Sequence, residues 1–305
     1  MRSFVARRVL SGALVMVTVS LLVFVLSRMT GDPRELYVDE YTTADSYAAM
    51  GRAMGLDKPL VVQYGIWMAN AIQGDFGVSL FTRTDALPYI LERILPTLQL
   101  TAGAFIFALI TGIPLGVLSA VKRGTVWDYL GRIFALYGQA LPAFWLGVML
   151  ILIFAVRLDW LPTGKRGDWT HYVLPSVTLG WGAAAGLVRL TRSAMLDVLD
   201  SEFIKFARAK GVNSRSVLWK HAFRNAMVAP LTYAGVLLAA FLTGAVVTET
   251  VFAWPGLGRA AVTAVFNKDF PVMTGIVLFF AGFYVAANFF VDILYSVIDP
   301  RIRYT

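Results

Sequence analysis

Long apolar runs without charged residues limit the fold of this chain more than any other feature. Each run approaches or exceeds the length of about 20 residues that a helix needs to cross the hydrocarbon core of a bilayer. The sequence predicts six transmembrane helices, at 9–26, 98–121, 133–156, 172–188, 226–248 and 270–291. The mean hydropathy of +0.67 is far above that of ordinary soluble domains. We therefore expect an all-α integral membrane protein.

Basic residues between the apolar runs predict the orientation of the helices. Three arginines among the first eight residues precede the first run, which has no small-x-small cleavage site and is longer than the apolar part of a signal peptide. Because Lys and Arg accumulate on the cytoplasmic side, the N-terminus is predicted to lie there. The basic links at 122–132 and 201–230 and the arginines Arg301 and Arg303 place these links and the C-terminus on the same side.

The interval 31–95 has the opposite charge balance, since its acidic residues outnumber its Lys and Arg. Within it, Asp57-Lys58-Pro59 precedes a helical pattern that ends near Gly74. An interval of this length with its own helix predicts a small external helical insertion between helices 1 and 2. The chain then divides into the N-terminus with helix 1 (1–30), the insertion (31–95) and a core with five helices (96–305).

A basic segment at 201–230, called the basic elbow below, separates the fourth and fifth apolar runs. Its predicted first helix begins at Ser201 as N-cap and ends at Gly211, and Ser214 is predicted to cap a second helix. Phe203 and Phe206 have helical spacing and form an apolar face beside the basic residues. The residues alone leave two interpretations open: a helix–turn–helix that docks into a groove on a partner, or a basic loop on the membrane surface.

The sequence lacks the residues that several kinds of catalysis, metal binding and ATP hydrolysis require. The chain has no cysteine and only two histidines, His171 and His221, which have no paired metal-ligand spacing. No glycine-rich loop for nucleotide phosphates occurs either. We therefore expect no catalytic residue, no metal site and no ATP hydrolysis by this chain alone. The basic residues lie between apolar spans, which favours membrane topology over nucleic-acid binding.

Motifs along the whole chain carry a family resemblance. They are RRVL, GLDKPLVVQY, GDFGVS, ALPAFWLG, LDSEFIKFARAKGV, HAFRNA, GAVVTETVFAWPGLGR and DPRIR. In this order they resemble the first permease subunit of bacterial dipeptide, oligopeptide and nickel importers of the ATP-binding-cassette (ABC) class. The resemblance implies the type I ABC importer permease fold with six transmembrane helices in the bacterial inner membrane, and half of a translocation pore for peptides.

The resemblance also implies the partners of the chain. They are a second homologous permease, two separate ATPase subunits that hold ATP and magnesium, and an external solute-binding protein, while the chain itself binds no cofactor. Members of the family carry an E-A-A-x-x-x-G motif in the elbow, which forms coupling helices for the ATPase. Ala207 and Gly211 match this motif, whereas Lys205 replaces its glutamate and Phe206 its first alanine. The implied ATPase-coupling residues are Glu202, Phe203, Phe206, Ala207, Arg208, Gly211, Val217, Leu218 and His221.

Polar residues in the spans have two interpretations each. Gln99, Gln139 and Asn288 line a translocation path, or they form interhelical hydrogen bonds. Glu249 holds an external gate, or it is an interfacial residue that reaches water. The turn residues Pro255, Gly256 and Gly258 belong to the same gate, or to a plain turn. The prolines Pro114 and Pro142 are interpreted as ordinary helix kinks.

Other functional classes remain as alternatives. A stand-alone secondary transporter predicts paired ionisable residues in the membrane and two halves of inverted topology, and the spans show few charges and no repeat. A membrane-embedded enzyme predicts clustered His, Cys or carboxylates, which the spans lack. Within the importer interpretation, nickel chelates and glutathione-like compounds are alternative cargoes to peptides.

Overall fold

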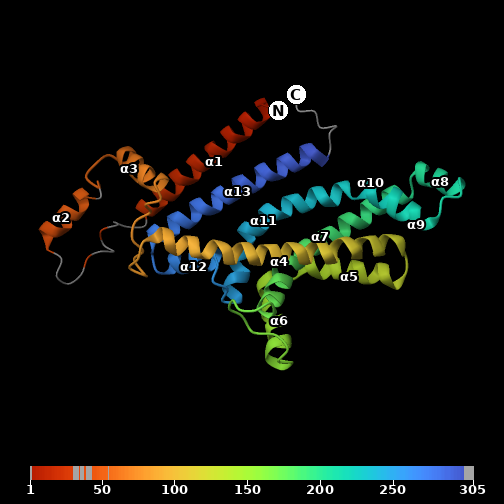
Figure 1. Ribbon diagram of the computed structural model, residues 1–305. Coiled ribbons are helices and arrows are strands. Elements are labelled where there is room, and N and C mark those ends of the chain that lie inside the picture. Colours follow the sequence, from red (N-terminus) through yellow and green to blue (C-terminus); the bar gives the residue numbers. More distant parts are fainter. Residues whose placement is uncertain (1, 30–33, 35–37, 39–42, 54, 299–305) are drawn as a thin grey trace. The chain divides into compact units, whose positions relative to one another are not determined.

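The computed structural model describes residues 2–29, 34, 38, 43–53 and 55–298 (Figure 1). The acidic residues Asp32, Glu35, Asp39 and Glu40 of the predicted insertion lie outside these residues, as do the DPRIR motif and its arginines. The prediction that the C-terminal arginines face the cytoplasm therefore concerns a part of the chain outside the described ranges.

The described residues form helices and no β-strand, apart from one isolated antiparallel bridge between Val78 and Asp85. The helices are α1 (Arg2–Met29), α2 (Ala44–Ala53), α3 (Leu60–Ile72), α4 (Ala86–Val121), α5 (Val126–Ala140), α6 (Ala143–Leu150), α7 (Thr170–Leu199), α8 (Glu202–Ala209), α9 (Ser214–Ser216), α10 (Arg224–Ala226), α11 (Val228–Val251), α12 (Leu257–Phe266) and α13 (Phe270–Ile298). Two π-helical turns, Ile151–Arg157 and Val217–Phe223, continue α6 and α9. The predicted all-α class is confirmed.

Four described helices are long and apolar enough to cross a membrane: α1 from Ala6, α4, α7 and α13 up to Val291. The bent pair Val126–Ala140 and Ala143–Arg157 makes a fifth if it is one span. α11 has 24 residues, and its apolar length is described for Val228–Leu238. The number of six transmembrane helices therefore stays a prediction.

The third predicted span is not one continuous helix. The chain bends by 111° between α5 and α6, at Leu141 and Pro142. Proline pushes the residue before it out of the helical region, and Leu141 is extended with φ −85° and ψ 129°. The interpretation of Pro142 as an ordinary kink is therefore wrong. At Pro114, by contrast, α4 continues without interruption.

The chain folds into two compact units. Unit 1 contains Met1–Leu95 and Gly256–Ala286, and unit 2 contains Pro96–Pro255 and the residues from Ala287. The core of unit 1 joins α12 and α13 to the first turns of α4, through Ile90, Leu257 and Ile276.

Asp269 organises the loop that precedes α4 in unit 1. This residue is 3% exposed and lies at the start of α13. Its carboxylate accepts hydrogen bonds from the Ser79 hydroxyl and from the backbone N–H groups of Leu80 and Phe81. A buried carboxylate needs such donors, so this one residue fixes both the loop and the helix start.

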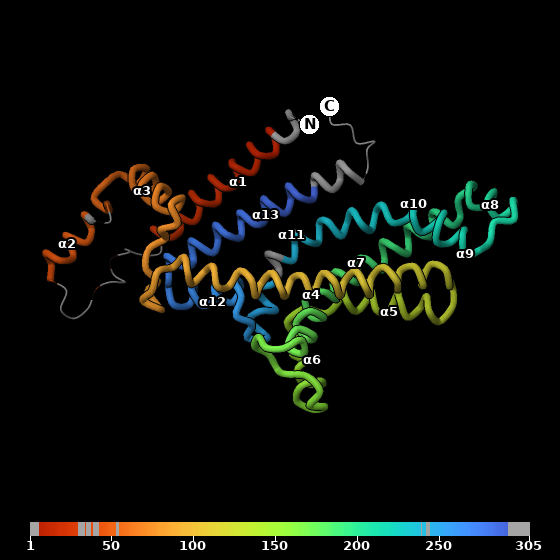
Figure 2. Tube along the Cα trace, viewed as in Figure 1, coloured from red at the N-terminus to blue at the C-terminus, as the bar shows by residue number. Residues whose placement is uncertain are grey.

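Small residues allow α7 to lie very close to its neighbours in unit 2. The buried cluster of α4, α7 and α11 is rich in alanine. The Cα trace of these three helices can be followed in Figure 2. A Cβ atom at Gly180 would lie 2.6 Å from the Ala104 carbonyl oxygen, and one at Gly112 would lie 2.6 Å from the Leu187 Cβ. Small residues such as Gly180 thus permit close helix packing.

A buried ion pair also joins α7 to α5. Asp128, in the first turn of α5, is 1% exposed. Arg192 of α7 donates to its carboxylate from Nε (2.8 Å) and Nη2 (3.0 Å). Ser119 Oγ of α4 donates at 2.7 Å and the Gly124 N–H at 3.0 Å. A bidentate pair with further donors meets the requirements for a buried charge, and sequence analysis did not predict it.

We expect Asp128→Asn to lower the free energy of unfolding by about 3 kcal/mol, because it leaves the Arg192 charge partly buried without its partner. The measurement is unfolding in mild detergent by titration with a denaturing detergent. Asp197→Asn, an exposed acid on the same helix α7, is the control and should change little. Equal stability of the two variants would contradict the role of the pair.

We expect Gly112→Ala to destabilise the protein by about 2 kcal/mol, because its Cβ would also lie 2.9 Å from the backbone oxygen of Ala184, which cannot rotate away. Gly282→Ala in α13 is the control, since a Cβ there meets nothing within 4 Å. The control should instead gain up to about 1 kcal/mol of helix propensity. The same unfolding titration compares them, and a stabilised Gly112→Ala variant would refute the close contact.

Candidate functional site

The basic elbow folds as a helix–turn–helix in unit 2. Its first helix, α8, is followed by Gly211 with φ +80°, the left-handed conformation that glycine adopts without strain. The Gly211 N–H donates to the Arg208 carbonyl and the Val212 N–H to the Ala207 carbonyl. The predicted glycine turn is confirmed. The second helical segment, 214–226, then leads through Met227 into α11.

The predicted caps are only partly correct. Ser201 is the N-cap of α8 with extended backbone, but its hydroxyl donates to the Val198 carbonyl and does not cap the helix. The second cap is Asn213 and not Ser214, because the Asn213 side chain accepts the Arg215 N–H at 2.9 Å. Asparagine and serine are both good caps, so residue type alone did not separate them.

The inner face of the elbow is fixed to the rest of unit 2. Ile204, Val217 and Ala222 are almost completely buried in one cluster with Met195 of α7 and Val117 of α4. Ala207 and Leu218 pack against this cluster and are half-buried. Val217 therefore lies in the core of the fold and takes no part in the exposed surface, although it was among the predicted coupling residues.

The outer face of the elbow exposes aromatic side chains among basic ones. Phe203, Phe206 and Trp219 are 46%, 61% and 52% exposed. The Lys210 ammonium lies 4.5 Å from the centroid of the Phe206 ring, and the Trp219 and Phe223 rings pack at a tilt of 56° with their centroids 5.3 Å apart. Exposed aromatic residues of this size are typical of protein interfaces. We call the residues Phe203, Phe206, Lys210, Trp219 and Lys220 the elbow surface.

The other predicted coupling residues lie around the elbow surface. Glu202 and Arg208 are exposed, and Glu202 accepts a hydrogen bond from Lys205 Nζ at 2.8 Å. His221 is half-buried. Trp219 was not among the predicted coupling residues, and its spacing of four from Phe223 was the only signal for it in the sequence.

The two glutamines among the predicted path residues have interhelical partners in unit 2. Gln99 Oε1 of α4 accepts a hydrogen bond from the Tyr172 hydroxyl of α7 at 3.1 Å. Gln139 Oε1 of α5 accepts one from Arg189 of α7. Both glutamines thus make the contacts of the alternative interpretation, and their part in a path stays a prediction. Asn288 is half-buried on α13.

Glu249 is completely buried near the end of α11. Its Oε1 accepts a hydrogen bond from Thr97 Oγ1 at 2.6 Å. The interpretation of Glu249 as an interfacial residue that reaches water is therefore wrong. Its backbone oxygen accepts the Trp254 N–H, and the Trp254 indole N–H donates to the Pro96 carbonyl at 2.9 Å. The end of α11 and the adjoining turn are consequently held against α4 within unit 2.

The predicted gate turn leads directly into a helix. Pro255 is exposed, and Gly256 is the extended N-cap of α12, with φ −100° and ψ −179°. Gly258 is buried in the first turn of that helix. The motif thus combines a turn with a helix start, and a gate function for it stays a prediction.

Comparison with known families gives two adjoining matches. Residues 112–304 match the model described as "Binding-protein-dependent transport system inner membrane component", and residues 1–101 match its N-terminal companion. The glutathione transport system permease protein of Escherichia coli (strain K12) is 40% identical over 305 residues, with all of both chains covered. Its counterpart from Salmonella typhimurium is 41% identical over the same length.

Solved structures show the same fold at low sequence identity. The MetNI methionine ABC transporter has a chain with a TM-score of 0.57 at 20% identity, covering 69% of this chain and 96% of that one. An amino acid ABC transporter matches with a TM-score of 0.54 at 14% identity, covering 70% and 94%. The predicted importer fold is confirmed, and the chain is a transport subunit and not an enzyme. The chain belongs to the family of binding-protein-dependent transport system inner membrane components, the permeases of ABC importers.

Proposed function

We propose that the chain forms half of a translocation pore with a second, homologous permease, and that two ATPase subunits drive it. The elbow surface carries this proposal, because its aromatic and basic side chains stand exposed on a base that is packed into unit 2. An anchored surface of this kind transmits force to the helices behind it, whereas a loop lying loosely on a membrane does not. The ATPases hold ATP and magnesium, and this chain holds no cofactor.

The attachment of the elbow to α7 and α11 explains how movement of the ATPases would reach the transmembrane helices. Its first helix continues from α7 and its second segment leads into α11, so movement of the elbow moves both helices. The cluster of Ile204, Val217 and Met195 and the nearby Asp128–Arg192 pair resist independent sliding. Closure of the ATPase pair on ATP would draw the elbows of the two permeases together and open the pore outward, as in alternating access.

The proposed orientation has both termini in the cytoplasm and the insertion at 31–95 outside. The charge distribution supports it, since the elbow is the most basic segment and the insertion is acidic. The external binding protein would then deliver its cargo to the side that carries the insertion and the turn at Pro255.

The proposed cargo is a small peptide of the size of glutathione. The support is the identity of 40–41% over the full length with glutathione transport permeases, together with the peptide-importer motifs of the sequence. Reconstitution into liposomes with the second permease, the ATPases and the binding protein tests the proposal. ATP-dependent uptake of labelled glutathione or of a dipeptide is expected, and nickel uptake in preference to both would contradict the cargo. Uptake by this chain alone would contradict the pore.

We expect Gly211→Val to reduce transport-coupled ATP hydrolysis, because a β-branched residue at φ +80° costs about 1–2 kcal/mol and displaces the second segment of the elbow. No neighbour lies within 4 Å of a Cβ there, so the effect would come from backbone strain and not from a clash. Gly211→Asn is the matched control, since asparagine tolerates the left-handed region. A normal hydrolysis rate in the valine variant would exclude this turn from coupling.

We expect Phe206→Ala and Trp219→Ala to weaken binding of the ATPase subunits, each by roughly 30-fold if the residue is an interface hot spot worth about 2 kcal/mol. Co-purification in mild detergent measures the loss. Phe266→Ala and Trp169→Ala remove rings that are even more exposed, 83% and 75%, far from the elbow in sequence, and should leave the ATPases bound. Unchanged co-purification of the elbow variants would show that the ATPases dock elsewhere.

A further inference from the structure

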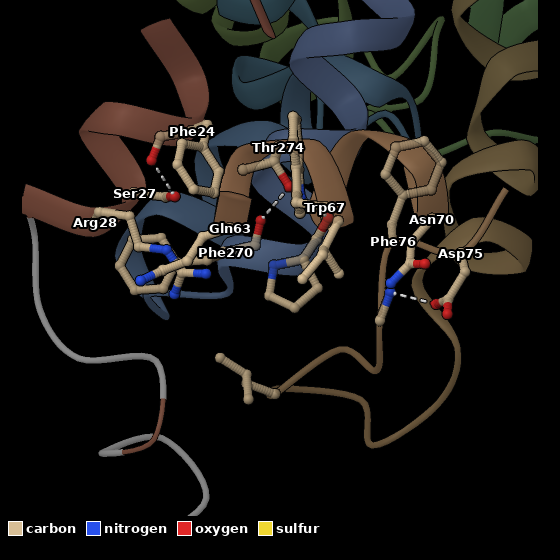
Figure 3. Close-up of a pocket in the computed structure, with 14 residues that line it drawn as sticks. Phe24, Ser27, Arg28, Gln63, Trp67, Asn70, Asp75, Phe76, Phe270 and Thr274 are labelled. Atoms are coloured by element: carbon tan, nitrogen blue, oxygen red, sulfur yellow. Dashed lines mark hydrogen bonds between the residues drawn. The ribbon is translucent and has the colours of Figure 1, made fainter. Parts of the chain in front are cut away.

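Unit 1 contains a cavity of about 240 Å³ whose lining residues include none of the predicted coupling, path or gate residues (Figure 3). Its walls come from the last turns of α1, one face of α3, the loop at 75–80 and the first turn of α13. Its volume equals that of roughly eight water molecules at about 30 Å³ each, which is enough for a small polar group. Aromatic rings form much of its wall, and charged and amide side chains lie among them.

Gln63 lines this cavity and has an unused hydrogen-bond acceptor. The side chain is 8% exposed, and its Nε2 donates to the backbone oxygens of Lys58 (2.8 Å) and Leu56 (3.2 Å). These two bonds fix the amide, because a flipped amide would lose both of them. Its Oε1 is buried and has no hydrogen-bond partner among the described residues. Buried polar atoms are rarely left in this state, so a ligand with N–H or O–H donors is indicated.

Charged groups of both signs lie at the same cavity. Asp75 is exposed, and its carboxylate accepts one hydrogen bond, from the Gly77 N–H at 2.9 Å, which leaves lone pairs for a cation. Arg28 lies with its guanidinium carbon 5.2 Å from the centroid of the Phe24 ring, and that ring lies 5.7 Å from the Trp67 ring. Aromatic faces also favour an ammonium group. The cavity therefore suits a molecule in which a donor-bearing cation is close to an anion.

The surroundings of the cavity indicate that this molecule is a lipid. On α3, Leu60, Val61 and Ile72 are 62%, 82% and 78% exposed, and α1 exposes Leu22 and Leu26 near the cavity end of the helix. Helices with such surfaces lie in contact with acyl chains or in the headgroup region. A ligand that enters here meets polar groups beside apolar surface, as a phospholipid requires.

We propose that this cavity binds the headgroup of a zwitterionic phospholipid with a primary ammonium, the phosphoethanolamine class. Its phosphate pairs with Arg28, and its ammonium donates to Gln63 Oε1 and to Asp75. A trimethylated ammonium has no N–H to donate, and a glycerol headgroup has no cation. The site therefore distinguishes phosphatidylethanolamine from both phosphatidylcholine and phosphatidylglycerol.

Native mass spectrometry of the full-length chain, with equal amounts of phosphatidylethanolamine, phosphatidylcholine and phosphatidylglycerol, tests the proposal. We expect phosphatidylethanolamine to be retained about tenfold better than either other lipid, as the loss of one hydrogen bond to a charged group predicts. Equal retention of the three lipids would overturn the proposal. Displacement of the bound lipid by soluble phosphoethanolamine would support the headgroup site, whereas displacement by a free dipeptide at lower concentration would overturn its assignment to lipid.

Two variants locate the site. Asp75→Asn keeps an acceptor for the Gly77 N–H but removes the charge, and Gln63→Leu removes the buried acceptor. Both are expected to abolish the preference for phosphatidylethanolamine over phosphatidylcholine. Asp45→Asn and Gln73→Leu, at exposed positions of the same unit, are the matched controls and should keep it. A preference that survives in both Asp75→Asn and Gln63→Leu would refute the site, and because Asp75→Asn preserves the local hydrogen bond, misfolding does not obscure this result.

Discussion

The contact between the backbones of α4 and α7 is the constraint on which unit 2 depends. Glycine at positions 112 and 180 removes the side chains that would separate the two helices, and alanine fills the remaining space. Lipid chains are as apolar as leucine, so helices in a membrane gain little from hiding apolar surface and rely on close fit instead. This fit positions α7, and α7 in turn positions α5, α11 and the elbow.

Two kinds of contact transmit this position to the elbow. The first is the buried ion pair between Asp128 and Arg192, which joins the start of α5 to α7. The second is the apolar cluster in which Ile204 and Val217 anchor the two helical segments of the elbow. The exposed rings are therefore carried by a rigid support, which is the mechanical requirement for a lever between a motor and a pore.

Features with a local cause were predictable from the sequence. The all-helical class depends on hydropathy, and the glycine turn at Gly211 depends on the conformational range of one residue. Features that depend on contacts between residues distant in sequence were not predictable. The burial of Glu249 against Thr97 joins residues 152 positions apart, and the Asp128–Arg192 pair joins residues 64 positions apart. Neither distance leaves a periodicity that a reader of the sequence can detect.

The sharp bend between α5 and α6 has a consequence for the membrane around it. Pro142 is the N-cap of α6 and supplies no side-chain cap. The first helical hydrogen bond runs from the Leu146 N–H to the Pro142 carbonyl, so the N–H groups of Ala143, Phe144 and Trp145 have no acceptor among the described residues. Hydrocarbon cannot satisfy such groups. In the bilayer, the bend between α5 and α6 must therefore reach the hydrated headgroup layer, draw water inward, or be covered by another subunit. In each case these N–H groups are hydrated or buried against protein, while the helix surfaces around them contact lipid.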